Sequence, residues 1–270
     1  MKKVLYFDCF SGISGDMTIA ALIDLGIDKD AFKAELSKLN VDGFSVEFSR
    51  TEKSGIGAQD VDVILTNGEF DDSHEHHHHH DHCHDHNGHS HEHHHTHVHR
   101  NISDVYAIID NSSISESAKE LSKKIFMRVA KAEAKVHGKP IDEVHFHEVG
   151  ALDSIVDIVG ASILIYMIKP DRICSSVVND GHGFIKCQHG FMPVPAPATA
   201  EIFADSDVVY KQIDVNNEMV TPTGAAIIAE LADSFGMCPP MNVKKTGYGA
   251  GKRDFAIPNI LRVMLGETED

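Results

Sequence analysis

The sequence predicts an α/β or α+β fold: a single domain with a mixed sheet flanked by helices, interrupted by a disordered His-rich insertion. Three observations predict it. Strand and helix patterns alternate loosely along the chain, hairpin signals interrupt that alternation, and sixteen of the 21 histidines fall within residues 69–100. The rest of the chain is long enough to bury a sizeable core. We therefore expect a core of residues 1–68 plus 101–266, with residues 69–100 as the metal-binding insertion.

The first part of the core predicts a strand, two helices and a hairpin. A short unbroken run of apolar residues indicates a buried strand, whereas alternating apolar and polar residues indicate a strand with one exposed face. A turn is expected at residues 54–57, where Ser and Gly separate two alternating segments. The expected strands are 4–7, 44–50 and 60–65, and the expected helices are 17–25 and 29–39.

The clearest helix follows the histidine tract. Ser113 and Glu116 predict a capping box, apolar residues recur at helical spacing from Ile114 to Val136, and Gly138 ends the pattern. The remaining helices are expected at 151–167, 198–203 and 222–235. The remaining strands are expected at 172–178, 207–211, 242–248 and 259–265, with a tight reversal at 181–190.

Composition excludes several classes of protein. A net charge of −17 argues against a nucleic-acid surface. The five cysteines form no CxxC pair, so neither a disulfide framework nor a structural zinc finger is indicated. The longest apolar run, Ile158 to Ile168, is too short to span a membrane, and the N-terminus lacks a signal-peptide pattern. A cytoplasmic protein that contacts no membrane is expected.

The histidine tract predicts metal capture, because neutral imidazole is a common ligand for nickel, zinc and copper. An expression tag is one alternative explanation. The tract is internal, irregular and rich in acids, which argues against a tag. A solvated spacer explains its Asp, Gly, Asn and Ser, but not its histidines. The candidate ligands of the tract are His76, His78, His80, His82 and His84.

A second candidate metal site is the segment VHFHE with the acids that follow it. His145 and His147 project to one side of an extended segment, and Asp153 and Asp157 share one helix face. Imidazoles with nearby carboxylates suit a divalent metal. The alternative is that Asp153 caps a helix or forms a salt bridge and His145 is exposed.

The turn DCFSGISGD predicts a ligand site at a helix start. Its glycines permit close backbone approach, and free amides at the start of a helix favour an anion. Ser11 and Ser14 are candidate substrate contacts, and Asp8 and Asp16 are candidate metal or substrate ligands. The turn lacks the spacing and lysine of a P-loop. A plain N-cap at Asp16 is the alternative.

Two further segments carry weaker signals. Cys187 and His189 offer a thiolate and an imidazole that suit nickel, with His182 across the reversal, but a structural hairpin explains them equally well. Thr221 and Thr223 at a helix start offer hydroxyls and free amides to a carboxylate or phosphate, although capping alone explains them.

A basic, glycine-rich segment, residues 244–253, stands out in this acidic chain. Four cations and three glycines fit a phosphate or polycarboxylate ligand, with Lys252 and Arg253 as the expected contacts. A flexible turn with solvated lysines is the alternative.

In these motifs the chain resembles the nickel-insertion proteins of the lactate racemase system. The similarity rests on YFDCFSGISGDM, VHFHEVGALDSIVDIVG, CQHGFMPVPAPAT, TPTGAA and GYGAGKRDF, in that order, with the histidine-rich segment in the matching place. The resemblance implies a CTP-dependent nickel chelatase of the lyase class. It would insert nickel into pyridinium-3,5-bisthiocarboxylic acid mononucleotide, giving the nickel-pincer nucleotide of lactate racemase. We expect the C-terminal domain of the family, which binds CTP with Mn or Mg, to be absent from this chain.

The resemblance implies partners and roles. The expected partners are nickel, the pyridinium substrate, the CTP-binding part, the lactate racemase apoprotein and further copies of this chain. Because a nickel–carbon bond requires loss of a ring proton, a general base is needed, and His147 and Glu148 are the candidates. A nickel or zinc storage chaperone remains the non-enzyme alternative. A metal-dependent hydrolase that uses His145, His147 and Asp157 is a third.

Overall fold

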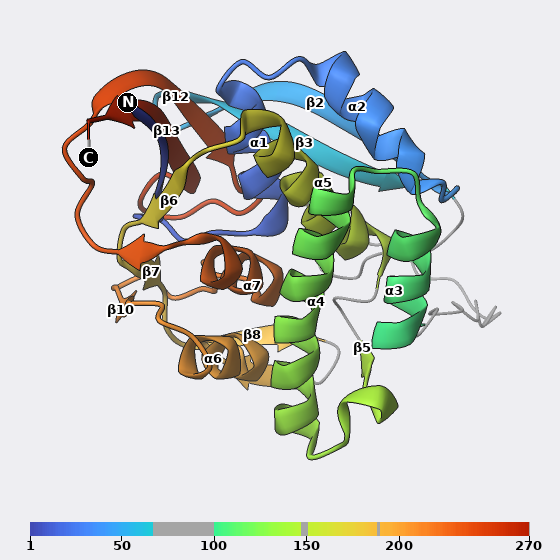
Figure 1. The fold of residues 1–270 in the computed structure, drawn as a ribbon. Coiled ribbons are helices and arrows are strands. Elements are labelled where there is room, and N and C mark those ends of the chain that lie inside the picture. The colour runs from blue at the N-terminus through green and yellow to red at the C-terminus, as the bar shows by residue number, and fades with distance from the viewer. Residues whose placement is uncertain (67–99, 147–150, 188–189, 270) are drawn as a thin grey trace, which may run out of the picture.

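The computed structural model describes residues 1–66, 100–146, 151–187 and 190–269. Its centre is a seven-stranded mixed sheet, drawn in Figure 1. The strands of this sheet are β1 (Lys2–Asp8), β2 (Phe44–Lys53), β3 (Ile56–Leu65), β6 (Arg172–Ser175), β11 (Ser234–Phe235), β12 (Asn242–Ala250) and β13 (Ile260–Thr268). Their order is β11-β6-β1-β13-β12-β3-β2.

Both parallel and antiparallel pairs build the sheet. β1 runs parallel to β6 and antiparallel to β13, and β6 runs parallel to β11. β13 and β12 are antiparallel, as are β2 and β3, whereas β12 meets β3 in a parallel pair. The last strand of the chain therefore lies between β1 and β12 in the middle of the sheet.

The helices form the second part of the fold. They are α1 (Gly15–Asp24), α2 (Lys29–Leu36), α3 (Ile102–Asn111), α4 (Glu116–His137), α5 (Leu152–Ile168), α6 (Pro197–Ala204) and α7 (Pro222–Leu231), with short 3-10 turns at Ser37–Leu39 and Ile141–Glu143. α1 packs on β12 and β3, α5 packs on α1, and α4 packs on α5, α6 and α7. The helices therefore pack on one another as well as on the sheet (Figure 1).

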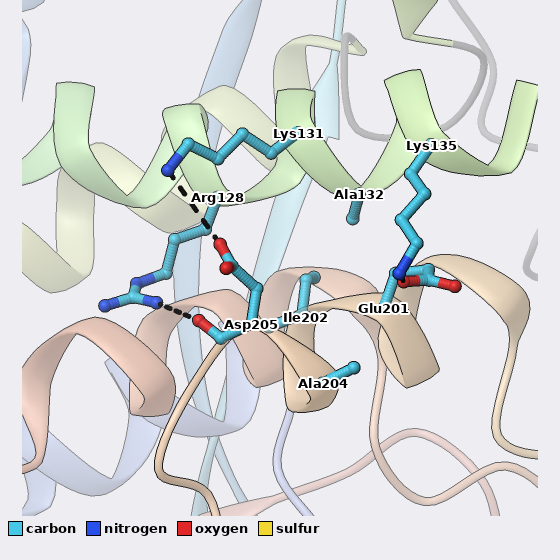
Figure 2. Close-up of a pocket in the computed structure, with 8 residues that line it drawn as sticks. All are labelled: Arg128, Lys131, Ala132, Lys135, Glu201, Ile202, Ala204 and Asp205. Carbon is cyan, nitrogen blue, oxygen red and sulfur yellow. Dashed lines mark hydrogen bonds and ion pairs between the residues drawn. The ribbon is translucent and has the colours of Figure 1, made fainter. Parts of the chain in front are cut away.

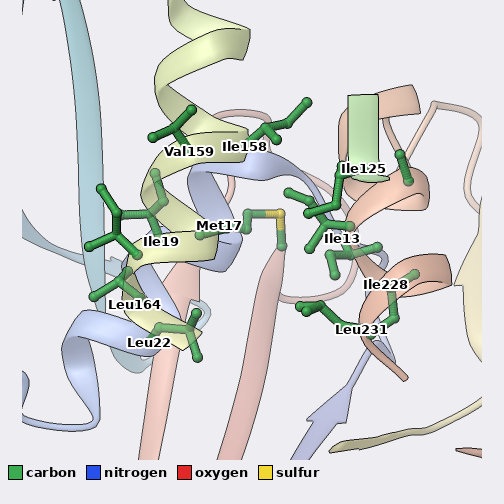
Figure 3. Close-up of a cluster of buried hydrophobic side chains, with 14 of the residues drawn as sticks. Ile13, Met17, Ile19, Leu22, Ile125, Ile158, Val159, Leu164, Ile228 and Leu231 are labelled. Carbon is green, nitrogen blue, oxygen red and sulfur yellow. The ribbon is translucent and has the colours of Figure 1, made fainter. Parts of the chain in front are cut away.

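The main core lies between the sheet and these helices. Figure 3 shows Met17, Ile19 and Leu22 of α1 close to side chains of α5, with α7 on the other side. Leu5 and Phe7 of β1 point into this cluster, whereas Val4 and Tyr6 belong to a small cluster on the opposite face of the sheet. Burial of this apolar surface is the main force that holds the layers together.

Three two-stranded ladders complete the fold of the described residues. They involve β4 (Arg100–Asn101) with β5 (His145–Phe146), β7 (Val178–Asp180) with β10 (Tyr210–Gln212), and β8 (Phe184–Cys187) with β9 (Gly190–Pro193). The β8–β9 ladder confirms the reversal predicted at residues 181–190. The β4–β5 ladder confirms that His145 lies in extended backbone.

The predicted fold class is confirmed: a mixed sheet flanked by helices. The predicted histidine tract, including His76, His78, His80, His82 and His84, lies outside the described residues.

Several predicted boundaries were wrong. The helix expected to begin with a Ser113–Glu116 capping box begins instead after Ser115, whose hydroxyl accepts a hydrogen bond from the amide of Ala118. The amide of Ser113 donates to the carbonyl of Lys38. The helix expected at 222–235 ends at Leu231, because residues 234–235 form the edge strand β11. α3 carries a capping box of its own, made by Asn101 and Asp104, and was not predicted.

Candidate substrate site at two helix starts

The loop after β1 and the segment before α7 join side by side. The amide of Ile13 donates to the carbonyl of Met219 over 3.0 Å, and the amide of Thr221 donates to the carbonyl of Ile13 over 3.2 Å. α1 begins two residues after Ile13, and α7 begins one residue after Thr221. The two helix N-termini, which the sequence predicted as separate ligand sites, therefore lie together.

Gly12 permits this close approach. Its φ is +83°, and a Cβ atom at this position would lie 1.9 Å from the carbonyl oxygen of Met219. No larger residue fits there without moving one of the two segments. The sequence predicted that Gly12 allows a ligand to approach the backbone. In the structure it is the backbone of Met219 that lies against Gly12.

Two of the predicted substrate hydroxyls cap the helices. Ser14 accepts a hydrogen bond from the amide of Met17 over 3.4 Å and donates to the carboxylate of Asp16. Thr221 accepts one from the amide of Gly224 over 3.1 Å. The alternative N-cap at Asp16 was wrong, since Ser14 is the cap and Asp16 lies in the first turn. An acid there is favourable, because it faces the positive end of the helix dipole.

The other two predicted hydroxyls are buried. Thr223 lies in the first turn of α7 and is 7% exposed. Ser11 is fully buried, and its hydroxyl has no hydrogen-bond partner among the described residues. A buried polar atom without a partner is unusual and carries a free-energy cost. The hydroxyl of Ser11 is therefore a predicted substrate contact that forms no hydrogen bond with the described residues.

Carboxylates hold both predicted cations. Nζ of Lys252 lies 2.6 Å from Oδ1 of Asp60 and 2.6 Å from Oδ1 of Asp62. Burial lowers the pKa of Lys252, but the hydrogen bonds to these two acids raise it more, so the net shift is upward. Nη1 of Arg253 lies 3.6 Å from the carboxylate of Glu218, and it donates to Oδ1 of Asn217 over 3.1 Å and to the carbonyl of Glu218 over 3.4 Å. Both cations therefore lie beside the joined loops with neutralising partners.

The basic, glycine-rich segment 244–253 lies largely in a strand, which confirms the strand predicted at 242–248. β12 includes residues up to Ala250, and only the last three residues of the motif lie beyond it. A Cβ atom at Gly247 or Gly249 would lie 2.1 Å from a carbonyl oxygen of α1. These two glycines therefore allow α1 to pack closely on the sheet, and they do not form a phosphate loop.

Two of the predicted metal carboxylates occupy defined places near α1. Asp8 forms an ion pair with Arg262, whose Nε donates to Oδ2 over 2.9 Å. Asp157 of α5 packs against Gly15, where a Cβ atom would lie 2.4 Å from its Oδ2. The carboxylate of Asp157 thus lies at the start of α1, beside Gly15, which directly precedes Asp16. Asp153 lies in the first turn of its own helix.

The other predicted metal ligands are only partly described. His145 pairs with Asn101 in the β4–β5 ladder, and Cys187 is the last residue of β8. His147, Glu148 and His189 lie outside the described residues. Within the part of the chain that the structure describes, no three His, Cys, Asp or Glu side chains form a group that could hold a metal ion.

The proposed place of His182 was wrong. It precedes β8, whereas Cys187 ends that strand, so the two residues lie at opposite ends of the hairpin. Its Nε2 lies 3.0 Å from Oδ1 of Asp214.

The sequence reasoning missed Asp180. This residue is fully buried, and its Oδ1 accepts hydrogen bonds from the amides of Met219 and Val220 in the joined segments. No motif marks it. The available signal was an acid at the end of an apolar stretch, since a buried acid requires hydrogen-bond donors.

A cavity of about 330 Å³ lies elsewhere, between α4 and α6 (Figure 2). Its cations are engaged by acids: Nε of Arg128 lies 2.6 Å from Glu230, and Nζ of Lys135 lies 2.5 Å from Glu201. Ion pairs between neighbouring helices thus line this cavity. None of the candidate site residues lines it.

The described helices include none with the length and apolar character needed to cross a bilayer. Fold and site together define an α/β protein with a polar, carboxylate-rich site at two adjoining helix starts.

Sequence comparison identifies the family. The profile of the nickel insertion protein family matches residues 5–270, and the chain belongs to this family. It is 48% identical over 268 residues to the pyridinium-3,5-bisthiocarboxylic acid mononucleotide nickel insertion protein of Acetivibrio thermocellus, covering 99% of this chain and 61% of that protein. The protein of the same name from Clostridium acetobutylicum is 50% identical over 279 residues, covering 99% of this chain and 64% of that protein.

A putative nickel insertion protein of Maridesulfovibrio salexigens is 54% identical over 268 residues, covering 99% of this chain and 64% of that protein. The chain thus spans about three fifths of the length of the curated relatives it matches. No solved structure matched.

Proposed function

We propose that this chain takes part in nickel insertion into pyridinium-3,5-bisthiocarboxylic acid mononucleotide. The observation that carries the proposal is the 48–50% identity, across nearly the whole chain, to proteins named for that reaction. Nickel is a substrate in this proposal and not a resident cofactor. The reaction replaces a ring proton by nickel and adds two nickel–sulfur bonds, which makes the chain part of a lyase-type chelatase.

The joined helix starts support binding of the nucleotide phosphate. Backbone amides at a helix N-terminus favour an anion, and Ser11 and Thr223 add hydroxyls. Lys252 and Arg253 lie beside these helix starts, although acids already hold them. A phosphate would have to compete with Asp60, Asp62 and Glu218 for these cations.

The acids at the start of α1 support binding of the metal. Asp16 and Asp157 lie at the same helix N-terminus, and carboxylate oxygens accept divalent cations. His145, His147 and Glu148 precede α5, the helix that carries Asp157. We assign metal binding to the two histidines, and proton removal from the ring carbon to Glu148 or His147. Cys187 and His189 are proposed as further nickel ligands.

The described residues do not fit CTP with its metal ion. No three acidic or imidazole side chains among them form a metal-binding group, and Asp8, Asp60 and Asp62 are each held by a cation. We assign any use of CTP with Mn or Mg to sequence that the longer relatives have outside the matched part. Delivery of the product to lactate racemase, in the cytoplasm, completes the proposal.

A non-catalytic role in nickel storage or delivery is the second candidate. The sixteen histidines of residues 69–100 favour it, because a tract alone is enough to hold metal ions. A storage protein binds nickel but leaves the pyridinium compound unchanged. The two candidates therefore differ in their product.

Mass spectrometry of the pyridinium compound separates the candidates. It is incubated with nickel, CTP and this chain, with and without the C-terminal part of a longer relative. A nickel adduct supports the proposal, and a need for the added part assigns CTP use to it. The absence of an adduct in both mixtures, with nickel still bound to the chain, supports storage.

Substitution tests the assigned ligands. H145A and H147A are expected to abolish the adduct, whereas H137A, at the end of α4 beside Glu133, is the matched histidine control. An unchanged yield in H145A and H147A would remove both residues from the reaction.

A further inference from the structure

The carboxylate of Asp180 holds the segment that precedes α7. Its Oδ1 accepts three backbone hydrogen bonds, from Gly181 over 2.8 Å, Met219 over 2.8 Å and Val220 over 3.1 Å. The residue is fully buried at the end of β7, and its Oδ2 has no hydrogen-bond partner among the described residues. All of the described hydrogen bonds of this carboxylate therefore serve the local backbone.

The segment it holds, residues 217–221, contacts the main parts of the candidate site. We call these five residues the central strap. At one end, Asn217 and Glu218 bind the guanidinium of Arg253. At the other end, Thr221 caps α7. In the middle, the carbonyl of Met219 accepts the amide of Ile13 from the loop that starts α1.

β7 also holds the loop on the other side of the strap. Nδ2 of Asn179 donates to the carbonyl of Phe10 over 3.0 Å, and the amide of Asn179 donates to the carbonyl of Cys9 over 3.2 Å. The last two residues of β7 therefore fix both segments: Asn179 fixes the loop after β1, and Asp180 fixes the central strap.

The amides of Met219 and Val220 depend on this acid. Neither belongs to a helix or to one of the named strands, and the hydrogen bond that each donates goes to Asp180. Loss of the acceptor would leave two donors buried without a partner, which favours local opening of the strap. A shift of the strap would move Thr221, Arg253 and the start of α1 together.

We propose that Asp180 is a positioning residue of the substrate site: by holding the central strap, it sets the relative place of the two helix starts and of Arg253. The proposal rests on the proposed function for the identity of the substrate. The acid itself contacts no substrate, and its effect reaches the site through the strap.

The test compares D180A and D180N with D233N in the full chain. Oδ2 of Asp233 also accepts a backbone amide, from Ile173 over 2.8 Å, in the β6–β11 region outside the strap. D233N therefore controls for the loss of a charged acceptor elsewhere in the fold. The first readout is hydrogen exchange of the amides of Ile13, Met219 and Val220. The second is the dissociation constant of the pyridinium mononucleotide.

D180A should speed exchange of the strap amides by about tenfold or more and weaken substrate binding by about tenfold. D180N keeps one carbonyl oxygen for the amides, so both effects should be smaller, at about threefold. In turnover assays, KM should rise more than kcat falls, because the positioning of substrate groups is lost while the reacting groups remain. D233N should match the wild type in exchange at the strap and in affinity.

Each outcome decides the proposal. Unchanged strap exchange in D180A, or unchanged affinity despite faster exchange, overturns it. An equal loss of affinity in D233N also overturns it, because the effect would then be one of general stability. If D180A does not fold, the comparison of D180N with D233N decides in the same way. A wild-type chain that binds no pyridinium compound refutes the proposed function instead, while hydrogen exchange still reports whether Asp180 holds the strap.

Discussion

Replacement of Lys252 by Met tests the energetic role of the cation beside the joined loops. The substitution keeps the aliphatic stem and removes the ammonium that lies 2.6 Å from both Asp60 and Asp62. Asp60 is 20% exposed and Asp62 is 50% exposed, so the group is only partly screened by solvent. We expect a loss of about 2 kcal/mol, between the small value of surface pairs and the larger value of buried ones.

Lys53 provides the matched control. Its Nζ also lies 2.6 Å from a carboxylate, that of Asp254, but this acid is 86% exposed. K53M should therefore cost less than about 1 kcal/mol, although the distance is the same. The two substitutions differ in the number of acids that they leave without a cation, two against one, and in the burial of those acids.

Urea unfolding at pH 7 measures both changes in the free energy of unfolding, and thermal unfolding at pH 7 measures the accompanying changes in Tm. K252M should lower Tm by roughly 4–8 °C, from a typical shift of about 2–4 °C per kcal/mol at this size. The effect of K53M should shrink in high salt, whereas that of K252M should persist. Adding D60N to K252M should restore part of the stability, because one uncompensated acid is removed. An equal cost for K252M and K53M would refute the role assigned to the paired, less exposed acids around Lys252.

Three further outcomes are expected. Burial raises the pKa of Asp180 from its ordinary value of 3.8, so the wild type loses stability relative to D180N as pH rises from that value through the folded-state pKa. Unfolding at pH 4 and pH 7 should show that the free energy of unfolding of the wild type falls relative to that of D180N. An unchanged difference between the two proteins would contradict this prediction. Burial raises the pKa of the Cys9 thiol to about 12, so this thiol should not react with iodoacetamide at pH 8 in the native protein. Peptide mass spectrometry should find the label on the exposed Cys238 and not on Cys9. Deletion of residues 73–99 should leave Tm unchanged by calorimetry but lower the nickel stoichiometry in equilibrium dialysis.

Local signals in the sequence predicted local structure well. Gly138 ends α4 in the left-handed conformation, as its position after an apolar helical pattern indicated. Thr221 followed by Pro222 marked the start of α7. Where two serines competed for a cap, as Ser113 and Ser115 did before α4, spacing alone selected the wrong one.

Long-range partners were beyond such signals. Asp8 pairs with Arg262 from a strand 254 residues away, and no local spacing in the sequence indicates this partner. Gly247 and Gly249 were interpreted as part of a phosphate-binding segment, but a side chain at either position would collide with the backbone of α1. The roles of the site residues stay predictions, and His147 and Glu148 themselves lie outside the described residues.

The place of β13 has a consequence for the folding of this chain. Lys2 pairs with Thr268 and Asp8 pairs with Arg262, so the first strand of the chain obtains its antiparallel neighbour from the last. During synthesis, β1 and β12 cannot be joined until β13 has left the ribosome, and both keep an unpaired edge until then. Such non-local pairing slows folding and exposes strand edges to other chains. Removal of β13 should therefore yield an aggregating fragment and not a smaller folded domain.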